Sequence, residues 1–129
     1  MNPQKTNILI LDDEPDIRGE IFEFLVSSDF NVHEAGTPSE AFRVMSVHPI
    51  DIAIIDVHLP EMSGLEVLKE MQSSYPEIQV IMMSGHGDME SMAYALQLGA
   101  FDYFQKPFRL FKLLETIEKV RQCVTKVCY

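Results

Sequence analysis

The sequence predicts a doubly wound α/β domain, in which a parallel sheet carries helices on both faces. The chain has 129 residues, of which 47% are apolar and 23% charged, a size and composition typical of one packed domain. Short apolar runs suited to buried strands alternate along it with segments of helical apolar spacing. Strict alternation with short connections indicates parallel strands joined by right-handed crossovers.

Five short apolar segments are expected to form the strands. Residues 8–11, 52–55 and 78–83 have the composition of strands buried on both faces, and residues 32–35 and 101–104 are shorter candidates. Each of these segments is followed by a helical pattern. The predicted sheet therefore has five strands and five helices.

Apolar residues spaced three or four apart mark the inner face of each expected helix. In chain order these residues are Ile17, Ile21, Phe24 and Leu25; Ala41, Phe42 and Met45; Leu65, Leu68 and Met71; Met89, Met92, Ala93 and Leu96; and Leu110, Leu113, Leu114, Ile117, Val120, Val124 and Val127. Boundary signals agree with them. Thr37 and Pro38 predict a helix start, Pro76 closes the third helix and Gly99 ends the fourth.

Charge and composition exclude several classes of function. Ten basic and twenty acidic residues give a net charge of −10, which argues against direct binding of nucleic acid or an anionic membrane. No apolar run is long enough to span a membrane, and the start of the chain lacks a secretion signal, so we expect a cytoplasmic protein. Cys123 and Cys128 are expected to be free thiols, and His33 and His48 to be surface or packing residues rather than metal ligands.

Polar side chains follow four of the five expected strands. Asp12 and Asp13 follow the first, Asp56 the third, Ser84 the fourth and Lys106 the fifth. Parallel strands end at the same edge of a sheet, where ligands of open α/β sheets bind. The sequence therefore predicts a site at that edge.

Three carboxylates in one cleft repel each other unless they take up protons or bind a cation. An all-oxygen set suits magnesium, with manganese as a possible substitute, and a lysine opposite would complete a clamp for a transferring phosphoryl group. Any single aspartate could instead cap a helix, as Asp13 could before Glu14 and Pro15. The joint arrangement favours phosphoryl chemistry. Nucleotide binding is disfavoured, because the segment from Gly85 to Gly87 lacks the third glycine of a dinucleotide fingerprint and the sequence has no phosphate loop ending in Lys-Ser or Lys-Thr.

Four ordered motifs carry a resemblance to a known family. They are LDDE at residues 11–14, DVHLPEMSG at 56–64, MSGHGD at 83–88 and GAFDYFQKPF at 99–108. The chain resembles the receiver domains of two-component response regulators, the CheY-like superfamily, from residue 7 to about residue 124. The resemblance implies a single receiver domain over residues 1–129, with a flavodoxin-like three-layer sandwich and strand order 2-1-3-4-5.

By this resemblance Asp56 is the phosphoacceptor, which takes a phosphoryl group from a phosphohistidine of a histidine kinase or phosphotransfer protein. The resemblance also implies that Asp13, the Asp56 carboxylate and the backbone carbonyl of His58 hold Mg²⁺, with Asp12 assisting. Such a domain is a signalling switch and not a conventional enzyme, because it catalyses only its own phosphorylation and dephosphorylation.

The resemblance assigns further roles around the acceptor. The Ser84 hydroxyl and the Lys106 ammonium are expected to bind phosphoryl oxygens, and the Lys106–Pro107 peptide bond to be cis. Tyr103 matches an aromatic switch position. Phosphorylation would then repack the fourth helix, fifth strand and fifth helix, the face that controls an output partner, with transcriptional regulation as the expected output.

Two further expectations concern regulation. His58 and His86, each two residues after a site residue, are expected to lie at the mouth of the site and tune the lifetime of the phosphorylated form. The active form is expected to form a homodimer through the fourth helix, fifth strand and fifth helix. That face carries charges of both signs, on Asp88, Glu90, Asp102, Arg109, Lys112, Lys119 and Arg121.

Two other functions remain open from the sequence. A metal-dependent phosphatase of small phosphoesters also uses an aspartyl phosphate, although such enzymes resemble one another in an Asp-x-Asp pair after the first strand, whereas here the acids are adjacent. A pseudo-receiver that acts only as a binding scaffold would tend to lose the acceptor aspartate or the lysine. Both residues are present here, as Asp56 and Lys106.

Overall fold

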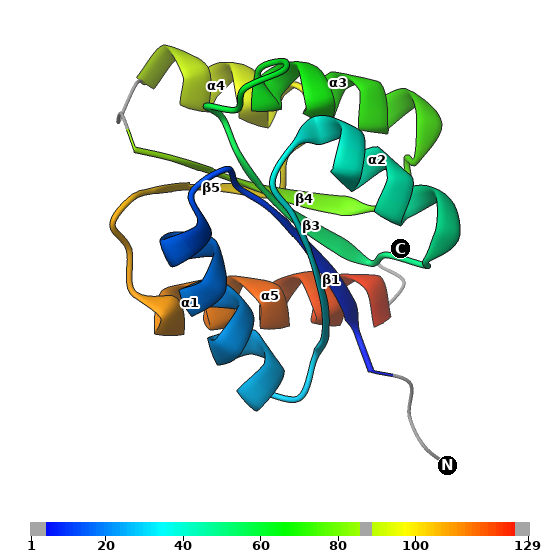
Figure 1. Cartoon of the computed structure of the whole chain (residues 1–129), viewed down its shortest axis with the longest axis vertical. Coiled ribbons are helices and arrows are strands. Elements are labelled where there is room, and N and C mark those ends of the chain that lie inside the picture. Colours follow the sequence, from blue (N-terminus) through cyan, green and yellow to red (C-terminus); the bar gives the residue numbers. More distant parts are fainter. Residues whose placement is uncertain (1–4, 86–88, 126–129) are drawn as a thin grey trace.

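Strands and helices alternate along the chain in the computed structural model, which describes residues 5–85 and 89–125 (Figure 1). The strands are β1 (Asn7–Leu11), β2 (Asn31–Ala35), β3 (Ile52–Asp56), β4 (Gln79–Ser84) and β5 (Asp102–Gln105). The helices are α1 (Pro15–Ser27), α2 (Pro38–Val47), α3 (Gly64–Ser74), α4 (Met89–Gln97) and α5 (Leu110–Thr125). The predicted order of elements is confirmed.

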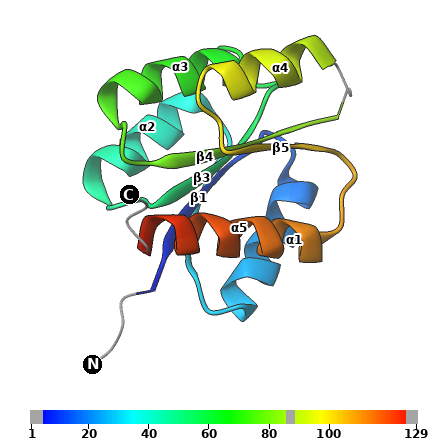
Figure 2. The same ribbon diagram turned by 180° about the vertical axis from the view of Figure 1, so that it is seen from behind.

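The strands form one parallel sheet in the order β2-β1-β3-β4-β5, as expected. Helices α2, α3 and α4 cover one face and α1 and α5 the other (Figures 1 and 2). The fold is therefore the three-layer sandwich that the alternation predicts. None of the helices in the described ranges is long and apolar enough to cross a membrane.

Two apolar cores lie on the two faces of the sheet. Successive residues of the central strands point to opposite faces, so Leu9 and Ile55 pack under α2, α3 and α4, while Ile10 and Ile54 pack over α1 and α5. All four side chains are fully buried. Each contributes roughly 1.5–3 kcal/mol of transfer free energy, before the cost of chain entropy.

Local capping explains where several helices begin and end. The Thr37 hydroxyl accepts a hydrogen bond from the Glu40 N–H at 3.2 Å, and Pro38 occupies the first helical position of α2. Gly99, after α4, has a φ of +108°, a left-handed conformation that favours glycine. The predicted boundaries at these residues are confirmed.

Some predicted strand limits are wrong by one residue. Strand β4 begins at Gln79 rather than Ile78, because the Ile78 N–H donates to the Tyr75 carbonyl in the turn after α3. Asp56 and Ser84 are the last residues of β3 and β4 rather than the residues after them. The two edge strands, β2 and β5, are only partly buried, since each has a neighbouring strand on one side alone.

The buried face predicted for α4 is wrong. Ala95 is the buried residue of this helix, whereas Met89 and Leu96 are exposed. A short helix that packs on the sheet through one small side chain leaves most of its other apolar side chains unburied. The spacing of apolar residues therefore predicted the wrong inner face for α4. On α5 the predicted face is correct at Leu113, Ile117 and Val120, as shown by their burial, and the side chains of Val124 and Val127 are not among those described.

Candidate functional site

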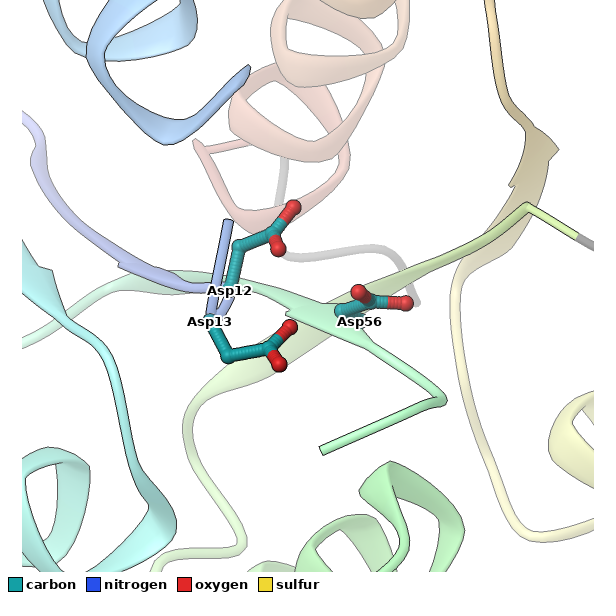
Figure 3. A group of neighbouring side chains, drawn as sticks. All are labelled: Asp12, Asp13 and Asp56. Carbon is teal, nitrogen blue, oxygen red and sulfur yellow. The ribbon is translucent and has the colours of Figure 1, made fainter. Parts of the chain in front are cut away.

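Three carboxylates lie together at the carboxyl edge of the sheet, as predicted (Figure 3). Asp12 and Asp13 follow β1 and Asp56 ends β3, and each offers a carboxylate oxygen within 4.8 Å of the others. Asp12 is fully buried, Asp56 is 3% exposed and Asp13 is exposed. Three close carboxylates, two of them buried, make a site of strong negative potential.

Lys106 enters this site from the segment after β5. Its Nζ lies 2.9 Å from Oδ2 of Asp12, 3.1 Å from Oδ2 of Asp56 and 3.1 Å from Oε1 of Glu14. The Lys106–Pro107 peptide bond is cis, the geometry that the resemblance implied. The Lys106 N–H donates to the Ser84 carbonyl at 2.7 Å, so the backbone of this segment is tied to the end of β4.

Burial and charge act in opposite directions on the ionisation of these groups. Burial raises the pKa of the Asp56 carboxyl, and the charge of Asp12 raises it further, against the opposing charge and hydrogen bond of Lys106. Burial alone would lower the pKa of the Lys106 ammonium. Its hydrogen bond to Asp12 and the charges of Asp56 and Asp12 outweigh that effect, and the pKa of Lys106 is raised. Lys106 is therefore a fixed positive charge beside the Asp56 carboxylate.

The segment between β3 and α3 folds back tightly over Asp56. The His58 N–H donates to Oδ1 of Asp56 at 3.2 Å, and the Gly64 N–H donates to the Val57 carbonyl at 2.7 Å. A Cβ atom on Gly64 would lie 2.1 Å from the Asp56 backbone oxygen. Only glycine permits this approach, which positions the start of α3 against the end of β3. The His58 side chain is exposed.

Ser84 and Tyr103 lie on neighbouring strands near this edge. Ser84 ends β4 and is 1% exposed, and Tyr103 on β5 is paired in register with Met82 on β4. The Tyr103 ring packs against the core under α4, and its hydroxyl is buried with no hydrogen-bond partner among the described residues. His86, expected at the mouth of the site, and Asp88, expected on the dimer face, lie outside the described residues.

Sequence reasoning missed two residues that contact the site. Glu14, which ends the LDDE motif but was given no role in the site, reaches Lys106. Arg18 on α1 donates from Nη1 to the Asp12 carbonyl at 2.8 Å and from Nε to Oε1 of Glu34 at 3.0 Å. The N-cap of α1 is Glu14, with no side-chain cap, so Asp13 does not take the capping role that the sequence left open. No local signal predicts the pairing of Glu14 with Lys106, because the two residues are 92 positions apart in the sequence.

A further missed contact holds the segment that carries His58. Oε1 of Glu61 accepts hydrogen bonds from the backbone N–H of Ser39 at 3.0 Å and from its hydroxyl at 2.8 Å. Glu61 thereby satisfies donors in the first turn of α2, where the helix dipole favours a negative charge. The segment after Asp56 is thus fastened to α2 as well as to α3.

The residues present fit a magnesium ion. The described chain brings Asp12, Asp13 and Asp56 together as three hard oxygen donors, which is the ligand chemistry that Mg²⁺ prefers. No nitrogen or sulfur donor belongs to this group of described residues, so it does not have the composition of a zinc site.

Comparison with known proteins identifies the family. Residues 8–118 match the family described as the response regulator receiver domain. The chain belongs to this family. A putative response regulator, NtrX-like, of Rickettsia bellii (strain RML369-C) is 37% identical to this receiver domain over 123 residues, which cover 94% of this chain and 26% of that protein.

Solved receiver structures agree with the fold. The CheY-like receiver domain protein from Methanospirillum hungatei JF-1 has a TM-score of 0.89 at 29% identity, covering 95% of this chain and 99% of that one. The beryllofluoride-activated NtrC4 receiver domain dimer has a TM-score of 0.84 at 25% identity, covering 88% of this chain and 94% of that one.

Family membership has direct consequences for this receiver domain. Receiver domains are two-component signalling switches rather than conventional enzymes, and phosphoaspartate and Mg²⁺ binding at an acidic pocket are general properties of the family. The chain spans about a quarter of the length of the curated relatives it matches, for example 26% and 25% in two of them. The response regulators among those relatives are therefore much longer than this chain.

Proposed function

We propose that this receiver domain accepts a phosphoryl group on Asp56 from a phosphohistidine of a histidine kinase or phosphotransfer protein. The observation that carries the proposal is the buried Asp56 carboxylate, which ends β3 beside Lys106 and two further aspartates. An oxygen of Asp56 forms a bond to phosphorus while the bond from phosphorus to the imidazole nitrogen breaks. The nitrogen keeps the electron pair.

The surrounding residues prepare Asp56 for this step. The Lys106 ammonium opposes the effect of burial and favours the ionised carboxylate that attacks phosphorus. Asp12, Asp13, Asp56 and the His58 carbonyl would hold Mg²⁺ or Mn²⁺, which when bound offsets the repulsion between these carboxylates and the phosphoryl donor. Lys106 and the Ser84 hydroxyl would then donate to phosphoryl oxygens.

The proposed output is a change at α4, β5 and α5. Movement of Ser84 toward the phosphoryl group would shift the segment after β4, and Tyr103, whose buried hydroxyl lacks a partner in the described residues, would change its surroundings. Exposed apolar side chains, Met89 and Tyr94 on α4 and Phe111 on α5, offer surface for a partner. We propose a transcriptional output, because a relative from Proteus hauseri that is 30% identical over 116 residues is named the DNA-binding transcriptional regulator NtrC.

A homodimer of the active form through the same face belongs to this proposal. The beryllofluoride-activated NtrC4 receiver domain, a structural neighbour, is a dimer. Glu90, Arg109 and Lys119 are exposed on this chain, whereas Asp102 is half-buried, and its Oδ2 accepts from the Thr116 hydroxyl at 3.4 Å. Charge pairing is therefore expected from Glu90 rather than Asp102. Sedimentation of the beryllofluoride-treated domain at low salt should show dimers, and a monomer at high concentration would contradict this.

The test of the acceptor is intact-mass spectrometry after incubation with acetyl phosphate and Mg²⁺. The parent chain should gain the mass of one phosphoryl group, and Asp56→Ala should gain none. Undiminished incorporation in Asp56→Ala would overturn the proposal. Sustained turnover of a generic phosphoester by the parent would instead support the phosphatase alternative, and a parent that never incorporates phosphate would support the binding scaffold.

A further inference from the structure

We propose that Glu14 is a positioning residue, which holds Lys106 in the unphosphorylated domain and releases it when Asp56 carries a phosphoryl group. This inference rests on the proposed function of Asp56. Glu14 does not belong to the cluster of Asp12, Asp13 and Asp56 that could hold a metal ion. The side chain belongs to the N-cap of α1, yet it makes no capping hydrogen bond.

The first argument is the number of donors on Lys106. A lysine ammonium has three N–H groups and no acceptor. Three carboxylates surround its Nζ at hydrogen-bond distance, Asp12 at 2.9 Å, Asp56 at 3.1 Å and Glu14 at 3.1 Å. All three donors are thus engaged. A phosphoryl oxygen on Asp56 would need one of them, so one existing hydrogen bond has to break.

The second argument concerns which of the three hydrogen bonds of Lys106 costs the least free energy to break. The Asp12 side chain is 0% exposed and the Asp56 side chain is 4% exposed, so neither carboxylate would be hydrated by bulk water if Lys106 left it. The Glu14 side chain is 58% exposed. A released Glu14 carboxylate is hydrated at once, and exposed ion pairs contribute little to begin with. Glu14 is therefore the partner that yields.

The third argument is that only the Glu14 side chain has to move. Its backbone N–H donates to Oδ1 of Asp12 at 2.9 Å, and its carbonyl accepts the Arg18 N–H at 3.0 Å in the first turn of α1. The backbone at Glu14 is therefore held while the side chain rotates to solvent. The Glu14 side chain, which holds Lys106 in the unphosphorylated domain, therefore competes with an incoming phosphoryl group for this ammonium.

The experiment measures beryllofluoride affinity on the whole chain at saturating Mg²⁺, by titration of amide NMR shifts. Glu14→Gln removes the charge, and Glu14→Asp keeps the charge but shortens the side chain by one methylene. Both should bind beryllofluoride about two- to five-fold more tightly than the parent, because the competitor for Lys106 is lost. Asp16→Asn, which removes an exposed charge in the same turn of α1, should bind like the parent.

A second measurement separates positioning from a general effect. Proton exchange of the Lys106 ammonium, followed by ¹⁵N NMR, should be faster in Glu14→Gln and Glu14→Asp and unchanged in Asp16→Asn. Unchanged or weaker beryllofluoride binding in both Glu14 variants would overturn the inference, as would equal tightening in Asp16→Asn or tightening in Glu14→Gln alone. A parent that binds no beryllofluoride would overturn the proposed function, and the inference with it.

Discussion

A single methyl group added at Gly64 is expected to disturb both the stability of the domain and its acceptor. The Cβ of Gly64→Ala would lie 2.1 Å from the backbone oxygen of Asp56 and 2.9 Å from the Cα of Val57. These neighbours are backbone atoms at the buried end of β3 and of the residue after it, so they cannot rotate away as a flexible side chain would. The start of α3 must therefore move away from β3.

The cost follows from what that movement breaks. The hydrogen bond from the Gly64 N–H to the Val57 carbonyl, 2.7 Å long, contributes about 1 kcal/mol. Val67 and Leu68 on α3 are fully buried, so a shift of this helix disturbs the core, and overpacking of this kind costs about 1–3 kcal/mol. Gly64→Ala should therefore lower the free energy of unfolding by about 2–4 kcal/mol.

Gly19→Ala is the matched control. Gly19 lies within α1, where an added Cβ would meet no atom of the described residues within 4 Å apart from its chain neighbours and the backbone of its own helix. Because alanine favours a helix interior over glycine, this substitution should raise the free energy of unfolding by about 0.5–1 kcal/mol. The same chemical change is thus expected to act with opposite sign at the two positions.

Urea unfolding followed by circular dichroism checks both variants. The midpoint for Gly64→Ala should fall by roughly 1–2 M with the slope unchanged, and the midpoint for Gly19→Ala should rise. Phosphorylation of Asp56 by acetyl phosphate should also slow in Gly64→Ala, because the acceptor strand is displaced. A Gly64→Ala variant as stable as the parent would refute the argument from backbone contact.

Four further predictions test other parts of the site and fold. Excess chelator should abolish phosphorylation of Asp56, and added Mn²⁺ should restore it; incorporation that persists in chelator would contradict a metal requirement. Burial lowers the pKa of His33, as does the charge of the stacked His48, so the unfolded chain binds more protons below the ordinary pKa of 6.5. Stability should therefore fall as pH drops from 7.5 to 5, and less so in His33→Phe; identical pH profiles would exclude this pair as the cause. His58→Gly should shorten the lifetime of the aspartyl phosphate several-fold, about 1 kcal/mol in barrier, with Mg²⁺ affinity unchanged, whereas a longer lifetime would mean that His58 orients the attacking water. Tyr103→Phe should stabilise the unphosphorylated domain by about 1 kcal/mol in urea unfolding, because it removes a buried hydroxyl with no partner in the described residues; destabilisation would show that the hydroxyl is hydrogen-bonded.

Much of the fold was predictable because its signals are local. Apolar runs and helical spacings indicate whether a segment is buried and whether its apolar residues repeat as in a strand or a helix. Caps such as Thr37 and Gly99 depend on residues three or four positions away. Parallel strands then bring Asp56 and Lys106 to one edge whatever the details of packing. The aspartates, Ser84 and Lys106 of the candidate site could therefore be predicted from the sequence alone.

The predicted buried faces were wrong where no neighbouring element covers the apolar side of a segment. Met89 and Leu96 have the spacing of a buried face, but α4 is short and buries Ala95 instead. The same limit applies to β2 and β5, whose apolar composition did not reveal their edge positions. Composition measures how apolar a segment is, and only the neighbouring elements determine which side of it is covered.

The sequence by itself determined the order of elements, the sheet edge at which the polar residues gather and the family to which the chain belongs. The tertiary structure alone decided how those residues are paired: Glu14 with Lys106, Glu61 with Ser39, and Gly64 against the Asp56 backbone. Each of these contacts joins different elements of the fold. A shift of a helix on the sheet by one ångström would change these distances. The position of each helix results from the packing of the whole core rather than from any local pattern.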